Sequence, residues 1–404
     1  MSITVAILGL ALLILIHEAG HFFVALAVGM SPRKFYIGFP PALVKVRRRG
    51  IEYGIGSIPL GGYVKIPGMH RPAASDLELH LAAAKSEAPE LEEPLERVQA
   101  LLTQGRFDHA RSALDELRKA VAEARLSEPA AKGADRALVD VGDALSRDAY
   151  WRQATWRKVA VIAAGPLTNL VFAVALLAVV LMLGVPVDTT RTVESVLDGS
   201  PAQAAGLRPG DEIVALGGQA VEPDRISATI RASNGQPLRV TVLRDGRRTT
   251  LAAARPRRTD GDYRLGFALE PRVESYGPVG ATELAVRQTW QVTKSIGSTL
   301  GGLVTGENRK DVSSAVGIVQ GSSQAVDAGF RVYLQVLALI SLSLALLNLL
   351  PLLPLDGGHI TFSLIEAVRG RALGRAVYER ASIIGLALVL FLFAIGLSND
   401  IGRL

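Results

Sequence analysis

Two histidines and a glutamate near the N-terminus have residue types and a spacing that can bind zinc and activate water. His17, Glu18 and His21 form the motif HExxH. Residues four positions apart share one face of a helix, so both imidazoles can reach a single ion. Glu18 lies beside the first ligand, where its carboxylate can take a proton from a zinc-bound water. We therefore predict a hydrolytic zinc site with Glu18 as its general base.

The motif stands in an unusual place, because it interrupts an apolar run from residue 3 to about residue 28. A run of this length is typical of a transmembrane helix, and we expect a first span within residues 1–30. Ionisable residues are costly inside a membrane and usually mark function there. A soluble core helix with a hydrogen-bonded histidine pair is the alternative interpretation. The N-terminus lacks the basic start and the cleavage site of a signal peptide, so we expect the span to be retained.

The composition indicates a membrane protein with soluble parts. Hydrophobic residues make up 49% of the 404 residues, and the mean hydropathy is +0.29. The net charge of +6 comes from scattered arginines without a nucleic-acid-binding motif, so we expect no nucleic acid as partner. The basic cluster at residues 47–49 favours contact with membrane lipid headgroups instead. The chain has no cysteine, so any zinc ligands must be histidines or carboxylates.

The segments after the first span alternate in character. Residues 31–71 contain β-type runs broken by glycine and proline, which predict a membrane-associated β-hairpin region, with an ordinary surface hairpin as the alternative. Residues 72–150 are rich in Ala, Leu, Glu and Arg at helical spacing and predict a soluble α-helical insertion. We expect a second span at 157–186. Its Gly165 and Asn169 fit close helix packing or an amide hydrogen bond to a neighbouring helix.

A soluble domain and two further spans complete the expected organisation. Residues 190–272 contain short strands around the segment SPAQAAGLRPGD, which resembles the turn of a PDZ domain and predicts a PDZ-like α+β domain. Such domains bind extended peptides at a sheet edge, so we expect a peptide tail as partner. An amphipathic linker segment follows at 276–330. The third span, 331–360, ends in NLLPLLPLDGGH, and the fourth lies at 378–398. The predicted fold class is thus a multi-pass α-helical membrane protein with four spans and these soluble parts.

Basic residues near the span ends indicate the orientation of the chain. The segment after the first span carries the following basic residues, whereas the N-terminus carries none: Arg33, Lys34, Lys45, Arg47, Arg48 and Arg49. The end of the first span is therefore expected in the cytoplasm, and the PDZ-like domain outside. Asp356 then emerges on the same side as the two histidines. Because two histidines need a third protein ligand, we predict Asp356 as that ligand and assign His359 a supporting or helix-capping role.

Together these motifs resemble the site-2 protease family of intramembrane zinc metalloproteases, in particular the regulator of sigma-E protease type. The resemblance rests on HEAGH, IPLGGYVKIPG, AAGPLTN, the PDZ-like segment and NLLPLLPLDGGH, in that order. It implies one zinc ion per chain, held by His17, His21 and Asp356, with Glu18 as general base. It also implies that Asn348 helps to hold the substrate backbone near the zinc.

The same resemblance implies a substrate and a location. The substrate is a single-span membrane protein, such as an anti-sigma factor, that another protease has already shortened. A spanning helix hides its peptide bonds, so cleavage requires local unwinding, and a strand edge can replace the hydrogen bonds lost. The implied substrate-binding residues of the β-region are Ile58, Leu60, Gly61, Gly62 and Tyr63. The implied location is a bacterial inner membrane, with the active site toward the cytoplasm and the PDZ-like domain in the periplasm.

Two features depart from this family pattern, and two other functions compete with it. The chain has room for one PDZ-like domain where the most similar family members carry two, and the insertion at 72–150 has no recognised counterpart. A non-catalytic scaffold that captures peptide tails would predict decayed metal-binding motifs, yet the following residues are all present: His17, Glu18, His21 and Asp356. A transporter would predict inverted repeats, and the four spans are dissimilar.

Overall fold

The chain divides into two compact units, each with its own set of elements. The computed structural model describes residues 1–259, 261–305 and 314–402. The first unit is Met1–Leu177 together with Ala285–Leu404, and the second is Ala178–Leu284. The first unit contains the HExxH motif and the helical insertion, whereas the second consists mainly of β-strands.

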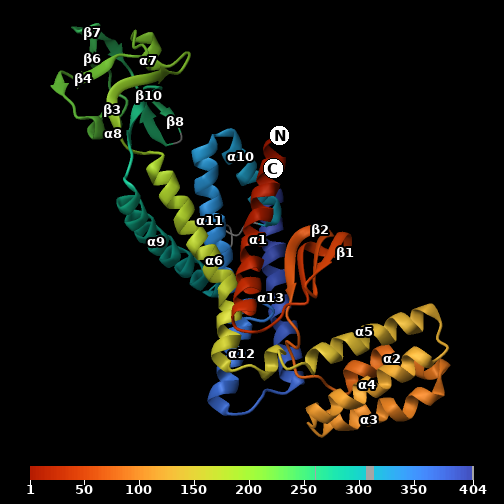
Figure 1. Cartoon of the computed structure of the whole chain (residues 1–404). Helices are drawn as coiled ribbons and strands as arrows, with labels where there is room; N and C mark the ends of the chain where they lie inside the picture. Colours follow the sequence, from red (N-terminus) through yellow and green to blue (C-terminus); the bar gives the residue numbers. More distant parts are fainter. Residues whose placement is uncertain (260, 306–313, 403–404) are drawn as a thin grey trace. The chain divides into compact units, whose positions relative to one another are not determined.

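Long apolar helices dominate the first unit. Among the described residues, four helices are long and apolar enough to cross a membrane, in agreement with the four expected spans. They are α1 Ser2–Ala27, α6 Thr155–Met182, α11 Phe330–Asn348 and α13 Arg375–Ile401 (Figure 1). Helix α1 contacts two of the others: the Tyr333 hydroxyl of α11 donates to the carbonyl oxygen of Val5 at 2.9 Å, and Gly20 lies against the backbone of α6.

Three further helices belong to the C-terminal half: α9 Pro278–Thr305, α10 Ala315–Asp327 and α12 Asp356–Arg369. The N-terminus of α10 is fixed by the buried Asp400 carboxylate of α13. That carboxylate accepts hydrogen bonds from the backbone amides of Ser314 and Gly317 and from the Ser314 hydroxyl, at 2.6–3.0 Å. An acidic side chain is favourable at a helix N-terminus, so this contact holds α10 to the last span.

The β-region forms one sheet that folds back on itself. Strands β1 Lys34–Arg48 and β2 Ile51–Lys65 pair in antiparallel fashion, but residues 34–37 pair on both sides, with 52–55 and with 62–65. The order across the sheet is 42–48, 51–56, 34–37 and 62–65. Residues 62–65 therefore form an edge, and no described strand pairs with their outer side.

This sheet carries a row of charged residues at one end and, apart from Lys45, mainly apolar side chains over the strands beyond it. Arg47, Glu52, Lys34 and Lys65 form a single row across the four segments. Away from that row, exposed apolar side chains such as Leu43, Val44 and Ile55 cover the sheet. Soluble proteins rarely expose a contiguous patch of this kind, which marks a membrane or binding surface.

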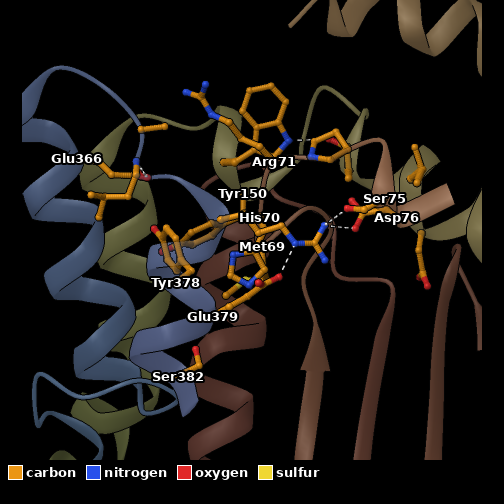
Figure 2. A pocket seen from close by; sticks show the side chains of 18 of the residues that line it. Met69, His70, Arg71, Ser75, Asp76, Tyr150, Glu366, Tyr378, Glu379 and Ser382 are labelled. Atoms are coloured by element: carbon orange, nitrogen blue, oxygen red, sulfur yellow. Dashed lines mark hydrogen bonds and ion pairs between the residues drawn. The ribbon is translucent and has the colours of Figure 1, made fainter. Parts of the chain in front are cut away.

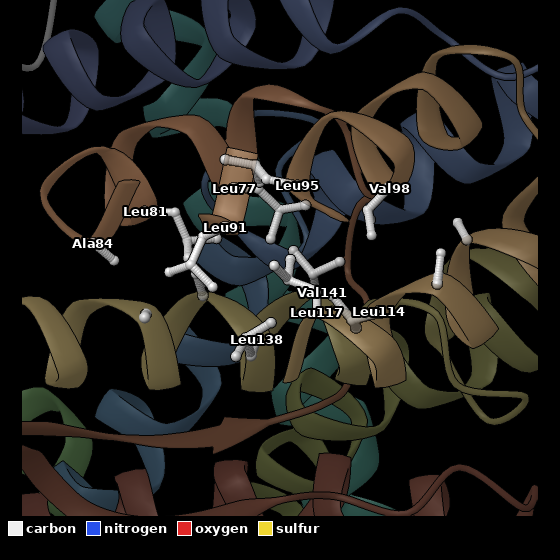
Figure 3. Packing of buried hydrophobic residues seen from close by; sticks show 14 of the residues in the cluster. Leu77, Leu81, Ala84, Leu91, Leu95, Val98, Leu114, Leu117, Leu138 and Val141 are labelled. Atoms are coloured by element: carbon white, nitrogen blue, oxygen red, sulfur yellow. The ribbon is translucent and has the colours of Figure 1, made fainter. Parts of the chain in front are cut away.

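The insertion is a bundle of helices with a core of its own (Figure 3). Its helices are α2 Ser75–Glu87, α3 Glu92–Thr103, α4 Phe107–Glu123 and α5 Glu128–Ala144, with short 3-10 turns at Pro89–Leu91 and Tyr150–Arg152. Their buried leucines and alanines, for example Leu81, Leu91 and Leu117, contact one another between residues 77 and 145. The helical spacing of these residues in the sequence produces this continuous apolar interior.

The second unit is a sheet covered by two helices. The strand order is β10-β3-β4-β6-β7, with bounds β3 Val185–Val196, β4 Glu212–Leu216, β6 Leu238–Arg244, β7 Arg247–Ala254 and β10 Phe267–Glu274. Strand β5 Gln219–Ala220 pairs with β4, and β8 Arg257–Thr259 pairs with β9 Asp262–Arg264. Helices α7 Pro201–Ala204 and α8 Pro223–Ala232 pack on a core that includes Val193, Ile213 and Val242.

Candidate active site

The two histidines of the HExxH motif lie on the buried face of α1. His17 and His21 are both 7% exposed, although they stand in a helix whose other residues are mostly apolar. Their Nε2 atoms are 3.3 Å apart. The i, i+4 spacing of a helix thus places both imidazoles at one point, as the sequence predicts.

Asp356 reaches the same point from the other end of the chain. Helix α11 ends at Asn348, and two prolines at 351 and 354 prevent the helix from continuing. The chain turns, and Asp356 becomes the first residue of α12. Its Oδ2 atom lies 3.2 Å from Nε2 of His17 and 3.4 Å from Nε2 of His21.

These three side chains fit a zinc ion. Zinc ligands at about 2.0–2.1 Å in tetrahedral geometry are separated by about 3.4 Å, close to the spacing of the three donor atoms here. The Asp356 Oδ2 atom is buried and has no hydrogen-bond partner among the described residues. A buried oxygen without a donor is costly, and a bound cation would satisfy it. His359 does not belong to this group, whose ligand atoms all lie within 4.8 Å of one another.

Helix α6 fixes the orientation of both imidazoles. The Nδ1 atom of His21 lies 2.8 Å from the carbonyl oxygen of Val161. A proton on Nδ1 donated to that carbonyl leaves the Nε2 lone pair available to a metal. The side-chain amide of Asn169 lies against Nδ1 of His17, with a nitrogen–nitrogen distance of 3.4 Å; with the amide turned by 180°, its oxygen, which has no partner among the described residues, accepts the Nδ1 proton. Asn169 is fully buried, and its part in the site follows from helix packing that the sequence alone does not show.

Gly165 of α6 makes room for the histidines. A Cβ atom at this position would lie 2.3 Å from Nε2 of His21 and 2.9 Å from Cε1 of His17. No real side chain tolerates such contacts, so only glycine permits α6 to approach α1 here. In the AAGPLTN segment, Gly165 therefore leaves the space that the two imidazoles occupy.

The edge of the β-sheet lies against Glu18. The backbone amide of Val64 faces the Glu18 carboxylate, which also lies within electrostatic reach of His17, His21 and Asp356. A Cβ atom on Gly62 would lie 3.0 Å from Cγ of Glu18 and 2.8 Å from the Tyr36 carbonyl oxygen. Gly62 thus permits the strand to pass directly beside the carboxylate.

The other residues that the sequence singles out lie at the end of α11 and on the β-sheet. Asn348 is half-buried at the end of α11, where its amide donates to the Leu344 carbonyl of the same helix at 3.0 Å. Ile58 is 43% exposed on the sheet. Gly61 has a positive φ of 144°, and the Tyr63 ring stacks on Tyr36 with centroids 5.4 Å apart. The side chain of Leu60 lies outside the described part of the structure.

Two histidines and an aspartate that can hold one metal ion, with a glutamate beside them and among helices long enough to cross a membrane, are the arrangement expected of a membrane-embedded zinc metallopeptidase. The chain belongs to peptidase family M50, whose sequence model matches residues 5–392. This membership confirms the resemblance to site-2 proteases and identifies zinc as the cofactor.

Named relatives agree along the full length of the chain. Protease RseP of Yersinia pestis is 30% identical over 446 residues, which cover 100% of this chain and 99% of that protein. Zinc metalloprotease RasP of Bacillus licheniformis is 29% identical, with 97% of this chain and 96% of that protein covered. Zinc metalloprotease RasP of Geobacillus kaustophilus is 28% identical, with coverages of 97% and 95%. The protein is therefore a zinc metalloprotease of the membrane, in a family that acts on membrane-protein substrates.

Proposed function

We propose that this protease cleaves the transmembrane segment of single-span proteins, such as anti-sigma factors, after another protease has shortened them. The observation that carries the proposal is an open strand edge beside the general base, within a helical membrane unit. A helical substrate must unwind to expose a peptide bond, and its freed backbone groups then need new partners.

The edge formed by residues 62–65 can supply those partners. Successive residues of a strand direct their backbone groups to opposite edges. The Lys65 carbonyl accepts a hydrogen bond from the Arg33 amide at 2.7 Å on the paired side, whereas the Val64 amide points to Glu18 on the other side. An unwound substrate that adds to this outer edge would bring its backbone next to Glu18.

The chemistry divides among the residues of the site. Zinc, held by His17, His21 and Asp356, would polarise the scissile carbonyl and make a bound water acidic. Glu18 would take the proton from the attacking water and pass it to the leaving amide nitrogen. Asn348 lies at the end of α11, and its amide can turn from the Leu344 carbonyl to the substrate backbone.

The second unit is proposed to be a PDZ-like domain that binds a peptide tail. Its sheet has open edges at β7 and β10, and peptides bind such edges as an added strand. The turn at the GLRPGD segment is held by Asp211, which accepts hydrogen bonds from the Arg208 amide and from Arg244. A shortened substrate would present a new chain end to this unit.

The proposed location is a bacterial inner membrane, with the active site toward the cytoplasm and the PDZ-like unit in the periplasm. The charged row of the β-sheet, which includes Lys34 and Lys65, would lie at the cytoplasmic surface, and the apolar part of the sheet would enter the membrane. The exposed arginines at 47–49 would contact lipid headgroups.

The experiment is cleavage of a shortened single-span substrate by purified protein in detergent, comparing wild type with Glu18→Gln. Loss of a general base costs about 10²- to 10⁴-fold in rate, so we expect at least a hundredfold decrease at equal zinc content. Glu78→Gln, an exposed glutamate of the insertion, is the matched control and should cleave normally. Normal processing by zinc-loaded Glu18→Gln would overturn the proposal.

A further inference from the structure

The helical insertion is joined to the rest of the first unit through ion pairs, in addition to the apolar contacts of Tyr150 at its end with Ile66 and Val161. Its apolar core consists only of residues between 77 and 145, so this core includes no residue of the membrane helices. Between the insertion and helices α6, α12 and α13 lies a cavity of about 700 Å³ (Figure 2). Apolar packing is therefore interrupted over this part of the interface, and the polar side chains that line the cavity contribute to the contact.

The charged groups around this cavity pair with one another. Arg375 at the start of α13 pairs with Asp76 of α2 and with Glu379, and Lys158 of α6 lies 3.8 Å from Glu366 of α12. Figure 2 shows Ser75 and Asp76 facing the side chains of α12 and α13 across the cavity. One such ion pair ties the insertion to the last span.

A second set of ion pairs ties the end of α5 to the base of the β-sheet. Lys65, the last residue of β2, lies 2.6 Å from Asp140 and 3.4 Å from Asp143. Arg33, directly before β1, lies 2.8 Å from Asp143 and contacts both carboxylate oxygens of Asp148, at 3.0 and 3.2 Å. Three carboxylates of one segment thus hold the first and last residues of the sheet segment, which lie side by side at its charged end.

These pairs are better shielded than ordinary surface pairs. The side chains of Lys65 and Arg33 are 29% and 27% exposed, and that of Asp143 is 16% exposed, whereas Asp140 is 47% exposed. Burial of Lys65 favours its neutral form, but the hydrogen bond to Asp140 and the neighbouring carboxylates raise its pKa above the ordinary value. The backbone contributes as well, because the amides of Tyr150 and Trp151 donate to the carbonyls of residues 67 and 68, at 2.8 and 3.1 Å.

The ion pairs of Lys65 lie one residue away from the strand segment that faces Glu18. Lys65 is bound by the insertion, and the backbone amide of the residue before it, Val64, faces the Glu18 carboxylate. A strand is stiff over one residue, so a shift of Lys65 displaces the Val64 amide and the neighbouring edge. Small displacements in an active site are costly to the reaction, about a hundredfold for 1 Å.

We propose that Asp140, Asp143 and Asp148 of the insertion are positioning residues, which hold the β2 edge against Glu18 through Lys65 and Arg33. The inference rests on the proposed cleavage of membrane segments, and it gives the insertion a role in that reaction. A cytoplasmic partner that displaced the insertion would thereby change the cleavage rate.

A double-mutant cycle in the full-length protein tests the pair nearest to Glu18. We expect Lys65→Met and Asp140→Asn each to lower the turnover rate by about tenfold, a size typical of one coupled pair. The combined variant should fall within about twofold of Lys65→Met alone, because both changes remove the same contact. Zinc content should stay at the wild-type level, since neither residue touches His17, His21 or Asp356.

The matched control is Arg97→Met, which breaks an exposed ion pair with Glu116 inside the insertion, at 2.9 Å. It should leave turnover unchanged. Hydrogen exchange supplies a readout that needs no catalysis: in Lys65→Met the amides of residues 62–65 should exchange faster, while those of α3 and α4 keep their rates. If turnover losses simply multiply in the cycle, or if exchange at 62–65 is unchanged, the positioning role is wrong. If wild type cleaves no membrane segment, the proposed function is wrong. The exchange result would still show whether the ion pairs of Lys65 with the insertion hold β2 in place.

Discussion

At the residue scale, the site consists of three side chains whose possible metal-binding atoms lie close together: Nε2 of His17, Nε2 of His21 and Oδ2 of Asp356. The spacing of HExxH is sufficient to predict two imidazoles on one face, and the prolines before Asp356 to predict a turn there. The contact between Asn169 and His17 could not be predicted, because it depends on where α6 crosses α1. The sequence shows only that an asparagine stands within an apolar span, where an amide needs a hydrogen-bond partner.

Replacement of Asn169 should weaken metal binding without unfolding the protein. Partners that orient a ligating histidine typically contribute 10- to 100-fold in metal affinity, so we expect the zinc affinity of Asn169→Ala to decrease by about that factor. Competition with a chelator of known affinity measures it. Leu167→Ala, at a half-exposed position on the same helix, should bind zinc like wild type. Unchanged affinity in Asn169→Ala would remove this amide from the site.

At the element scale, the sequence predicts helices and spans within one segment, but it does not predict which segments pair with one another. Apolar length predicts the four spans, and helical periodicity predicts the insertion. The sheet is different, because residues 34–37 pair on two sides with segments about 20 and 30 residues away. Nothing local in the sequence specifies that the second pairing leaves 62–65 at the edge beside Glu18.

The second unit offers a test of a buried ion pair. Burial alone would raise the pKa of Asp211, but hydrogen bonds from Arg244 and the Arg208 amide lower it below its ordinary value of 3.8. A lowered pKa stabilises the fold above the unfolded-state pKa, and the contribution is lost as pH falls through the folded value. We therefore expect the β4 and β6 amides to lose hydrogen-exchange protection below about pH 4.

Removal of the cation should reverse this pH dependence. In Arg244→Met the buried Asp211 carboxylate has lost its ion-pair partner, which typically costs about 3 kcal/mol at neutral pH. Protonation relieves that cost, so the variant should gain protection on acidification, relative to its value at pH 7. Equal protection of variant and wild type at pH 7 would show that the pair does not stabilise this unit.

At the scale of the whole molecule, the active site exists only when distant parts of the chain fold together. Residues 17 and 21 come from the first span, and residue 356 follows the third, more than 300 positions later. The number of spans between them already predicts that they emerge on one side of the membrane. For the insertion, in contrast, the sequence predicts only the helices. Its ion pairs to Arg33 and Lys65 could not be predicted, because hydrophobic periodicity gives no information about charged contacts between segments.

The most direct test of this account is the zinc content of the purified protein, with wild type beside Asp356→Ala. We predict about one zinc ion per chain in wild type and a sharp loss in the variant, because two histidines alone hold zinc weakly. His359→Ala, close in sequence but outside the ligand group, should keep its zinc. Full zinc content in folded Asp356→Ala, or a folded wild type that binds none, would contradict the account.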